Sequence, residues 1–135
     1  MSAVVKTDEG RGMLRILLTG AASTAAAGLG SIANPEGVAL VITRVFAYYR
    51  TGSTGAANLS AGITTAAASA TDAINAQDVI QATVGGKVIH EGAVQVAKTE
   101  VPTAIWTATK YLTFTGSATT VGLDADVYVE YTRLA

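Results

Sequence analysis

The sequence predicts an all-β fold, a β-sandwich or jelly roll of about seven or eight short antiparallel strands with an extended N-terminal arm. Segments rich in β-branched and aromatic residues alternate large apolar side chains with small or polar ones. Turn signals containing glycine, proline or asparagine separate these segments roughly every 8 to 15 residues. This spacing is typical of a sandwich and differs from the alternating strands and long helices of βαβ units.

The first part of the chain, residues 1–37, is expected to be an N-terminal arm and an Ala/Gly-rich connector. Residues 13–19 predict a short strand or an apolar anchor. Residues 20–33 are rich in alanine, glycine and serine, which indicates a loop, although a short alanine-rich helix over 21–27 is an alternative. The sequence Asn-Pro-Glu-Gly then marks a turn.

A signal peptide is an alternative interpretation of the same segment. Arg11 and Arg15 precede the apolar residues 16–18, and small residues follow them. However, Asp8 and Glu9 lie in the region that should be positive, and the apolar block is very short. The uncharged run that follows contains too many glycines and polar residues for a membrane-spanning helix. We therefore expect a strand followed by a loop.

The second part, residues 38–135, is expected to be the sandwich domain. Its strongest element is residues 38–50, which are dense in β-branched and aromatic side chains. Both alternating faces of this segment begin apolar, which indicates a strand inside the sandwich with both faces covered. In regular alternation, Leu40 and Ile42 share a face with Phe46.

Five further segments are expected to fold as strands or short turns, in the order 58–65, 72–81, 87–97, 104–115 and 125–134. The segment 72–81 fits either a short strand or a helical turn with Asp72 as its N-cap. The segment 87–97 fits a hairpin or a bulged strand. The alternation over 104–115 predicts one continuous strand.

The composition is poor in charge, and this bounds the possible functions. Charged residues make up 14% of the chain, against about 25% in ordinary soluble domains. The net charge of −1 and the lack of a basic stripe argue against nucleic-acid binding. We expect neighbouring subunits to bury much of the surface, and the alternative is a charge-poor but soluble monomer.

Residues that could support catalysis are scarce. His90 is the one histidine, cysteine is absent, and no G-x-S-x-G sequence occurs, so neither a zinc site nor a nucleophile elbow is expected. Asp124 and Asp126 could share a calcium ion, but a solvated turn is the simpler interpretation. We therefore predict no enzymatic activity, no cofactor and no metal, with a hydrolase using His90 as a distant alternative.

Apolar residues near the N-terminus and exposed aromatic residues are the expected contacts with other subunits. The aromatic residues could also form a platform for a sugar or a peptide, but aromatics at strand spacing more often fill a core or an interface. The predicted interface residues are Met13, Leu14, Ile16, Leu17, Leu18, Tyr48, Tyr49 and Trp106.

Several segments together resemble a known group of proteins. They are the strand V-A-L-V-I-T-R-V at 38–45, N-L-S-A-G-I at 58–63, the polar set Asp72, Asn75 and Asp78, and V-Y-V-E-Y at 127–131. Over roughly residues 38–134 the chain resembles the small jelly-roll decoration (cementing) proteins of tailed-bacteriophage capsids. The resemblance is one of style and transfers no signature residue.

The resemblance implies a structural virion protein that is assembled in the host cytoplasm and lies on the capsid exterior. Its expected partners are the major capsid protein, whose subunits it would bridge, and further copies of itself in a homotrimer. Neither nucleic acid nor a membrane is an expected partner. The alternative is a receptor- or carbohydrate-binding jelly-roll module of a fibre or surface appendage.

Overall fold

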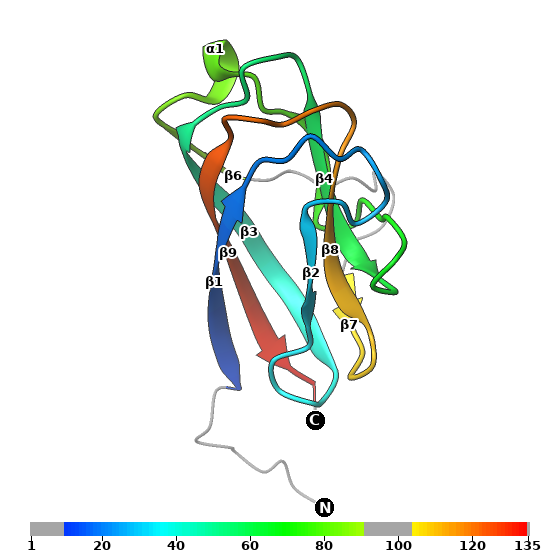
Figure 1. Ribbon diagram of the computed structural model, residues 1–135. Coiled ribbons are helices and arrows are strands. Elements are labelled where there is room, and N and C mark those ends of the chain that lie inside the picture. Colours follow the sequence, from blue (N-terminus) through cyan, green and yellow to red (C-terminus); the bar gives the residue numbers. More distant parts are fainter. Residues whose placement is uncertain (1–9, 91–103, 135) are drawn as a thin grey trace, which may run out of the picture.

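The computed structural model describes residues 10–90 and 104–134, which form two antiparallel sheets packed face to face (Figure 1). Sheet A contains β1 (Arg11–Thr19), β3 (Leu40–Thr51), β6 (Lys87–His90), β7 (Ala104–Trp106) and β9 (Asp124–Arg133). Sheet B contains β2 (Gly30–Ala33), β4 (Asn58–Thr64), β5 (Ile74–Asp78) and β8 (Tyr111–Gly116). A short helix, α1 (Gln81–Val84), lies between β5 and β6. The predicted all-β sandwich is confirmed.

The strand order is that of a jelly roll. Sheet A runs β1-β9-β3-β6, with β7 also paired to β3, and sheet B runs β2-β8-β4-β5. If β7 is set aside, the chain is one long hairpin rolled up on itself, because β1 pairs with β9, β2 with β8, β3 with β6 and β4 with β5. Each outer face of the sandwich is therefore formed by the strands of a single sheet.

The segment expected to be a connector contributes a strand to each sheet. β1 pairs with β9 along its whole length, and β2 pairs with β8. β2 consists of Gly-Ser-Ile-Ala, whose strand propensity is low, so its pairing with β8 and not its own pattern makes it extended. The remainder of the predicted arm, residues 1–9, lies outside the described residues, as do residues 91–103 of the predicted hairpin.

A bulge in β3 reverses the faces that simple alternation predicted. The register with β9 shifts between Ile42 and Arg44, so Thr43 is an extra residue on β3. An extra residue exchanges the two faces of a strand. Phe46 and Tyr48 therefore point away from the core, and the prediction that Phe46 shares a face with Ile42 is wrong. The Thr43 hydroxyl stabilises the bulge by donating to β9 at the backbone oxygen of Glu130, 3.1 Å away.

Two local predictions are also corrected. The segment 104–115 is divided by a turn, so that β7 joins sheet A and β8 joins sheet B. The indole N–H of Trp106 bridges this turn by donating to the Lys110 carbonyl at 2.9 Å. Asp72 does not cap a helix, because its carboxylate accepts a hydrogen bond from the backbone N–H of Ile63 at 2.8 Å. The N-cap of α1 is Ile80, without a side-chain cap.

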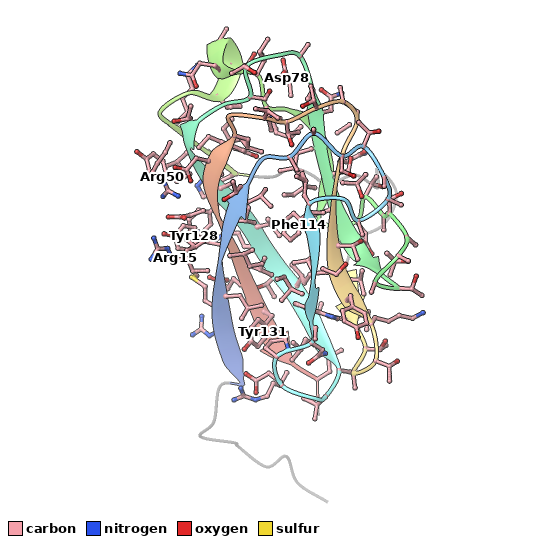
Figure 2. All side chains as sticks on the ribbon, in the orientation of Figure 1. Arg15, Arg50, Asp78, Phe114, Tyr128 and Tyr131 are labelled. Atoms are coloured by element: carbon pink, nitrogen blue, oxygen red, sulfur yellow. The ribbon has the colours of Figure 1, made fainter. Side chains whose placement is uncertain are left out.

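The core lies between the two sheets and fixes their relative position. Its largest fully buried side chains include Trp106, Tyr49, Phe114, Leu40, Ile42 and Leu59. Full burial of an aliphatic or aromatic side chain of this size contributes about 1.5–3 kcal/mol. Figure 2 shows Phe114 between the sheets, and Arg15, Arg50 and Tyr128 on the opposite side of sheet A. In residues 10–90 and 104–134, no helix is long and apolar enough to cross a membrane.

A polar contact ties β9 to the loop that joins β2 and β3. The Tyr131 hydroxyl donates to a Glu36 carboxylate oxygen at 2.6 Å, and Arg133 lies 3.5 Å from the other oxygen of that carboxylate. The ring of Tyr131 passes so close to Gly12 that a Cβ there would collide with it. Burial, together with the bond to Glu36, raises the pKa of Tyr131.

Candidate functional site

The face of sheet A that points away from sheet B is the candidate functional site. We call it the outer face of sheet A. Its side chains alternate along each strand with those that fill the core. They include Arg11, Met13, Arg15 and Leu17 on β1, Asp124, Asp126, Tyr128 and Glu130 on β9, Arg44, Phe46, Tyr48 and Arg50 on β3, and Val88 and His90 on β6.

A network of arginines and aspartates links three strands across this face. Arg50 of β3 donates to both oxygens of Asp124, at 2.8 and 3.1 Å, and to both oxygens of Asp126, at 2.8 and 3.0 Å. Arg15 of β1 donates to Asp126 from the other side at 2.9 Å. Asp126 is only 3% exposed. The bidentate geometry fixes the planes of the guanidinium and carboxylate groups, so the network is rigid.

The arginines set the charge state of the two aspartates. Hydrogen bonds from Arg50, and secondarily from Arg15, hold the pKa of Asp126 below its usual value. A hydrogen bond from Arg50 likewise lowers the pKa of Asp124. Both carboxylates face guanidinium groups, which leaves the alternative of a calcium site without support. The interpretation of these residues as a solvated turn is wrong, because both belong to β9 and Asp126 is buried. Among the described residues, no group of three or more His, Cys, Asp or Glu side chains could hold a metal ion.

A row of aromatic rings crosses the same face from β6 to β9. Phe46 stacks on Tyr128 with ring centroids 4.8 Å apart and 11° between the planes. His90 lies on the other side of Phe46, with centroids 5.3 Å apart. The Arg44 guanidinium lies 4.8 Å from the centre of the Phe46 ring. Each ring is held by its neighbours, so little side-chain entropy remains to be lost when a partner binds.

Exposed apolar side chains surround the arginine–aspartate network and the row of aromatic rings. Leu17 is 68% exposed, Val88 56%, Met13 48% and Tyr48 37%. The Arg50 guanidinium lies 5.9 Å from the centre of the Tyr48 ring, which ties Tyr48 to the ionic network. A hollow at the beginning of β1 is lined by Arg11, Gly12, Met13 and Glu130.

The structure separates the predicted interface residues into two groups. On the outer face of sheet A lie Met13, Leu17 and Tyr48. Inside the sandwich, where they pack on the core, lie Leu14, Ile16, Leu18, Tyr49 and Trp106. Alternation along β1 explains the division of the N-terminal residues, and the bulge in β3 explains why Tyr48 points outward.

Sequence reasoning missed the polar half of this surface. Arg15, Arg50 and Asp126 were not identified as an interacting set, because their positions are far apart in the chain. A partial signal was present in β9, where Asp124, Asp126, Tyr128 and Glu130 alternate with alanine and valine. That pattern indicates one polar face. It does not reveal which residues of other strands lie opposite.

The outer face of sheet B is partly covered by the chain itself. Segment 65–72 folds over β4 and β8, and Thr113 at the centre of β8 is completely buried beneath it. Gly62 is required there, because a Cβ at this position would collide with Asp72 and Ala70. The hydroxyl of Thr113 donates weakly to the Gly62 carbonyl at 3.4 Å.

The loop between β1 and β2 covers a second part of sheet B. The Ala27 N–H donates to the Thr115 hydroxyl at 2.8 Å, and the Leu29 N–H donates to the Phe114 carbonyl at 3.1 Å. Strands β2, β4 and β8 carry no charged residue. The loops therefore cover the centre of sheet B, although Tyr111 at the start of β8 stays 36% exposed, whereas the outer face of sheet A is left open by the described residues.

The groups on the outer face of sheet A are suited to non-covalent recognition. Arginine, tyrosine and methionine are enriched in protein–protein interfaces, where ordered aromatic and arginine side chains contribute most of the affinity. His90 takes part through its contact with Phe46. No model of a known protein family matches the chain, and no curated protein matches it either. The function must therefore be argued from this surface.

Proposed function

We propose that the chain is a structural virion protein that binds the outside of a viral capsid and stabilises it by bridging subunits of the major capsid protein. The outer face of sheet A is the proposed contact surface. The observation that carries the proposal is the pre-ordered set of arginines and rings on that face, in a chain with only 14% charged residues.

The physical chemistry of the surface favours a protein partner. Exposed residues such as Leu17 and Val88 gain free energy when a partner removes them from water, at about 25 cal/mol per Å² of apolar area. The ionic network beside them keeps polar groups paired, so burying the face leaves few unsatisfied donors. Many weakly bound copies on one shell would then act together through avidity.

The resemblance of residues 38–134 to capsid decoration proteins supports the viral setting and a homotrimer as the form of self-association. The jelly-roll winding is compatible with it, because this architecture occurs in viral capsid proteins. The same architecture occurs in lectins, which is why a receptor- or carbohydrate-binding module is the second candidate.

The positions of the aromatic residues favour a protein over a sugar as the ligand. A carbohydrate site needs aromatic faces that are open to the ligand. Tyr49 and Trp106 are fully buried, and Phe46 and Tyr128 each have one ring face occupied by the other. Tyr48 is exposed, but it is a single ring beside an arginine.

The proposal is tested by co-sedimentation of the purified protein with empty capsids assembled from the major capsid protein of the same virus. Two tyrosines of nearly equal exposure provide a matched pair, because Tyr48 is 37% exposed on sheet A and Tyr111 is 36% exposed on sheet B. We expect Tyr48→Ala to weaken binding at least about tenfold, which corresponds to about 1.4 kcal/mol. Tyr111→Ala should bind like the unmodified protein.

Two results would contradict the proposal. One is a protein that does not co-sediment with the capsids at all. The other is equal binding by both tyrosine variants, which would move the contact away from sheet A. A glycan array probed with the same protein tests the second candidate, which requires binding that depends on Tyr48.

A further inference from the structure

β1 forms one edge of sheet A over an unusually long stretch. It contains nine residues and pairs with β9 without any register shift. In the part of the chain that the structure describes, no strand lies on the other side of β1. In an antiparallel strand, alternate residues direct their N–H and C=O groups to opposite sides, so half of these groups in β1 face outward.

The other edges in the described ranges are blunted, and β1 is not. β6 has four residues and β7 has three on the far side of sheet A. In sheet B, β2 has four residues, and β5 pairs with β4 through a register shift. Ala76 in β5 has a positive φ of 54°, which disrupts that edge further. Short or bulged edges prevent pairing with foreign strands, whereas a long regular edge permits it.

The side chains beside this edge define the chemistry of a complementary strand. On the outer face β1 presents Met13, Arg15 and Leu17, whose side chains are accessible. The sequence of β1 contains two arginines and no carboxylate. Arg15 is 59% exposed although it bridges to Asp126, and a guanidinium has enough donors for a second carboxylate. The hollow at the beginning of β1 lies over the β1–β9 pair, because Glu130 of β9 lines it together with Arg11 and Met13 of β1.

We infer that the open edge of β1 accepts an extended segment of another protein, which adds a strand to sheet A. The segment is acidic opposite Arg15 and apolar opposite Met13 and Leu17. Backbone hydrogen bonds would supply affinity, and the alternating side chains would supply specificity. A second copy of β1 fits this edge poorly, because its only charged residues are arginines and like charges across a strand pair are destabilising.

This inference deepens the proposed function, since an added strand would be the means by which a shell subunit is held. It can nevertheless be tested without a shell. The probe is a fluorescent synthetic peptide as long as β1, with glutamate and valine alternating on one face and threonine on the other. One control peptide has lysine in place of glutamate. A second control is N-methylated at alternate residues, which removes the donors needed for strand pairing.

Fluorescence anisotropy measures peptide binding to the full chain. We expect the acidic peptide to bind, and both control peptides to bind at least about tenfold more weakly. Leu17→Glu in the protein should weaken binding by a similar factor, because it removes an apolar contact and repels the peptide. Val121→Glu, at a 49% exposed loop position, should change the affinity less than about twofold. Hydrogen exchange should show added protection in β1 on binding.

Three results would overturn the inference. They are the absence of binding up to about 1 mM peptide, equal binding of the N-methylated peptide, and self-association of the free protein that Leu17→Glu abolishes. The last result would make a second copy the occupant. Peptide binding without capsid binding would refute the proposed function alone. Capsid binding lost in Tyr48→Ala but unchanged in Leu17→Glu would refute only the added strand.

Discussion

The outer faces of the two sheets are opposites, although both belong to the same sandwich. Sheet B is covered by segments 65–72 and 20–29, and its strands β2, β4 and β8 carry no charge. Sheet A carries more than half of the charged side chains in residues 10–90 and 104–134, together with stacked rings and exposed aliphatic residues.

The difference shows where this charge-poor chain places its few charged side chains. A covering loop needs small side chains beneath it, which explains the alanine, glycine and threonine of sheet B. The ionic residues are gathered on the face that the described segments leave open, and there they are paired in a fixed geometry. The few charged residues of this chain are therefore concentrated on one surface.

The comparison predicts that introducing an arginine changes the free energy of unfolding much more on sheet B than on sheet A. Thr113→Arg would place a long cation beneath segment 65–72, where Thr113 is fully buried. We expect it to lower the free energy of unfolding by about 1 to 3 kcal/mol, because the covered position has no room for the longer side chain. Val88→Arg, at a position 56% exposed on sheet A, should change it by less than about 0.5 kcal/mol.

Urea denaturation followed by tryptophan fluorescence measures both values, since Trp106 is in the core. Thr113→Ser is the control for the loss of the threonine side chain alone. A Thr113→Arg variant as stable as Val88→Arg would mean that segment 65–72 does not seal sheet B.

Acid should lower the stability of the protein through the ionic network of sheet A. The pKa values of Asp124 and Asp126 are lowered in the folded protein, so their contribution to stability is present at neutral pH. It is lost as the pH falls below the ordinary aspartate pKa of about 4, because protonation breaks the bonds to Arg50 and Arg15. We expect the Tm to fall through this range.

An Asp126→Asn variant separates this effect from general acid unfolding. It should have a lower Tm than the unmodified protein at pH 7, because Arg50 and Arg15 lose an ionised partner. The fall of its Tm with acid should be shallower. Parallel curves for the two proteins would show that the network does not govern acid stability.

The smallest expected effect concerns the blunted edge of sheet B. Ala76 has a φ of 54°, in the left-handed region that costs a non-glycine residue about 1–2 kcal/mol. Ala76→Gly should raise the free energy of unfolding by about 0.5 kcal/mol, after the greater flexibility of glycine in the unfolded chain is subtracted. Ala82→Gly in α1 is the opposing control and should be destabilising. A destabilised Ala76→Gly variant would contradict the strained conformation.

The fold could be predicted because its signal is local. The strands at 38–50, 58–65 and 125–134 alternate clearly, and the structure places β3, β4 and β9 there. β2 could not be found, because four small residues become a strand only through β8. The division of segment 104–115 was hidden because the turn preserves the alternation, so Trp106 and Leu112 both reach the core.

The candidate site was predictable only in part. The exposed residues Met13, Leu17 and Tyr48 were expected at an interface, but their buried neighbours were expected there as well. A single extra residue, Thr43, decides which side of β3 faces outward, and no feature of the sequence marks it. The pairing of Arg50 with Asp126 depends on the register between β3 and β9, which is a tertiary property.

The contact of Tyr131 with Glu36 lies at the pole where β1 begins and β9 ends, since the Arg133 N–H donates to the Gly10 carbonyl at 2.6 Å. Tension applied between residues 10 and 134 would open the β1–β9 pairing from this pole like a zipper, one pair at a time. Tension that enters through the face of sheet A would load all those pairs together. The Tyr131–Glu36 hydrogen bond therefore lies at the end of the β1–β9 pair that would separate first. A partner that exerts force on the protein would meet more resistance through the face of sheet A than through the chain ends.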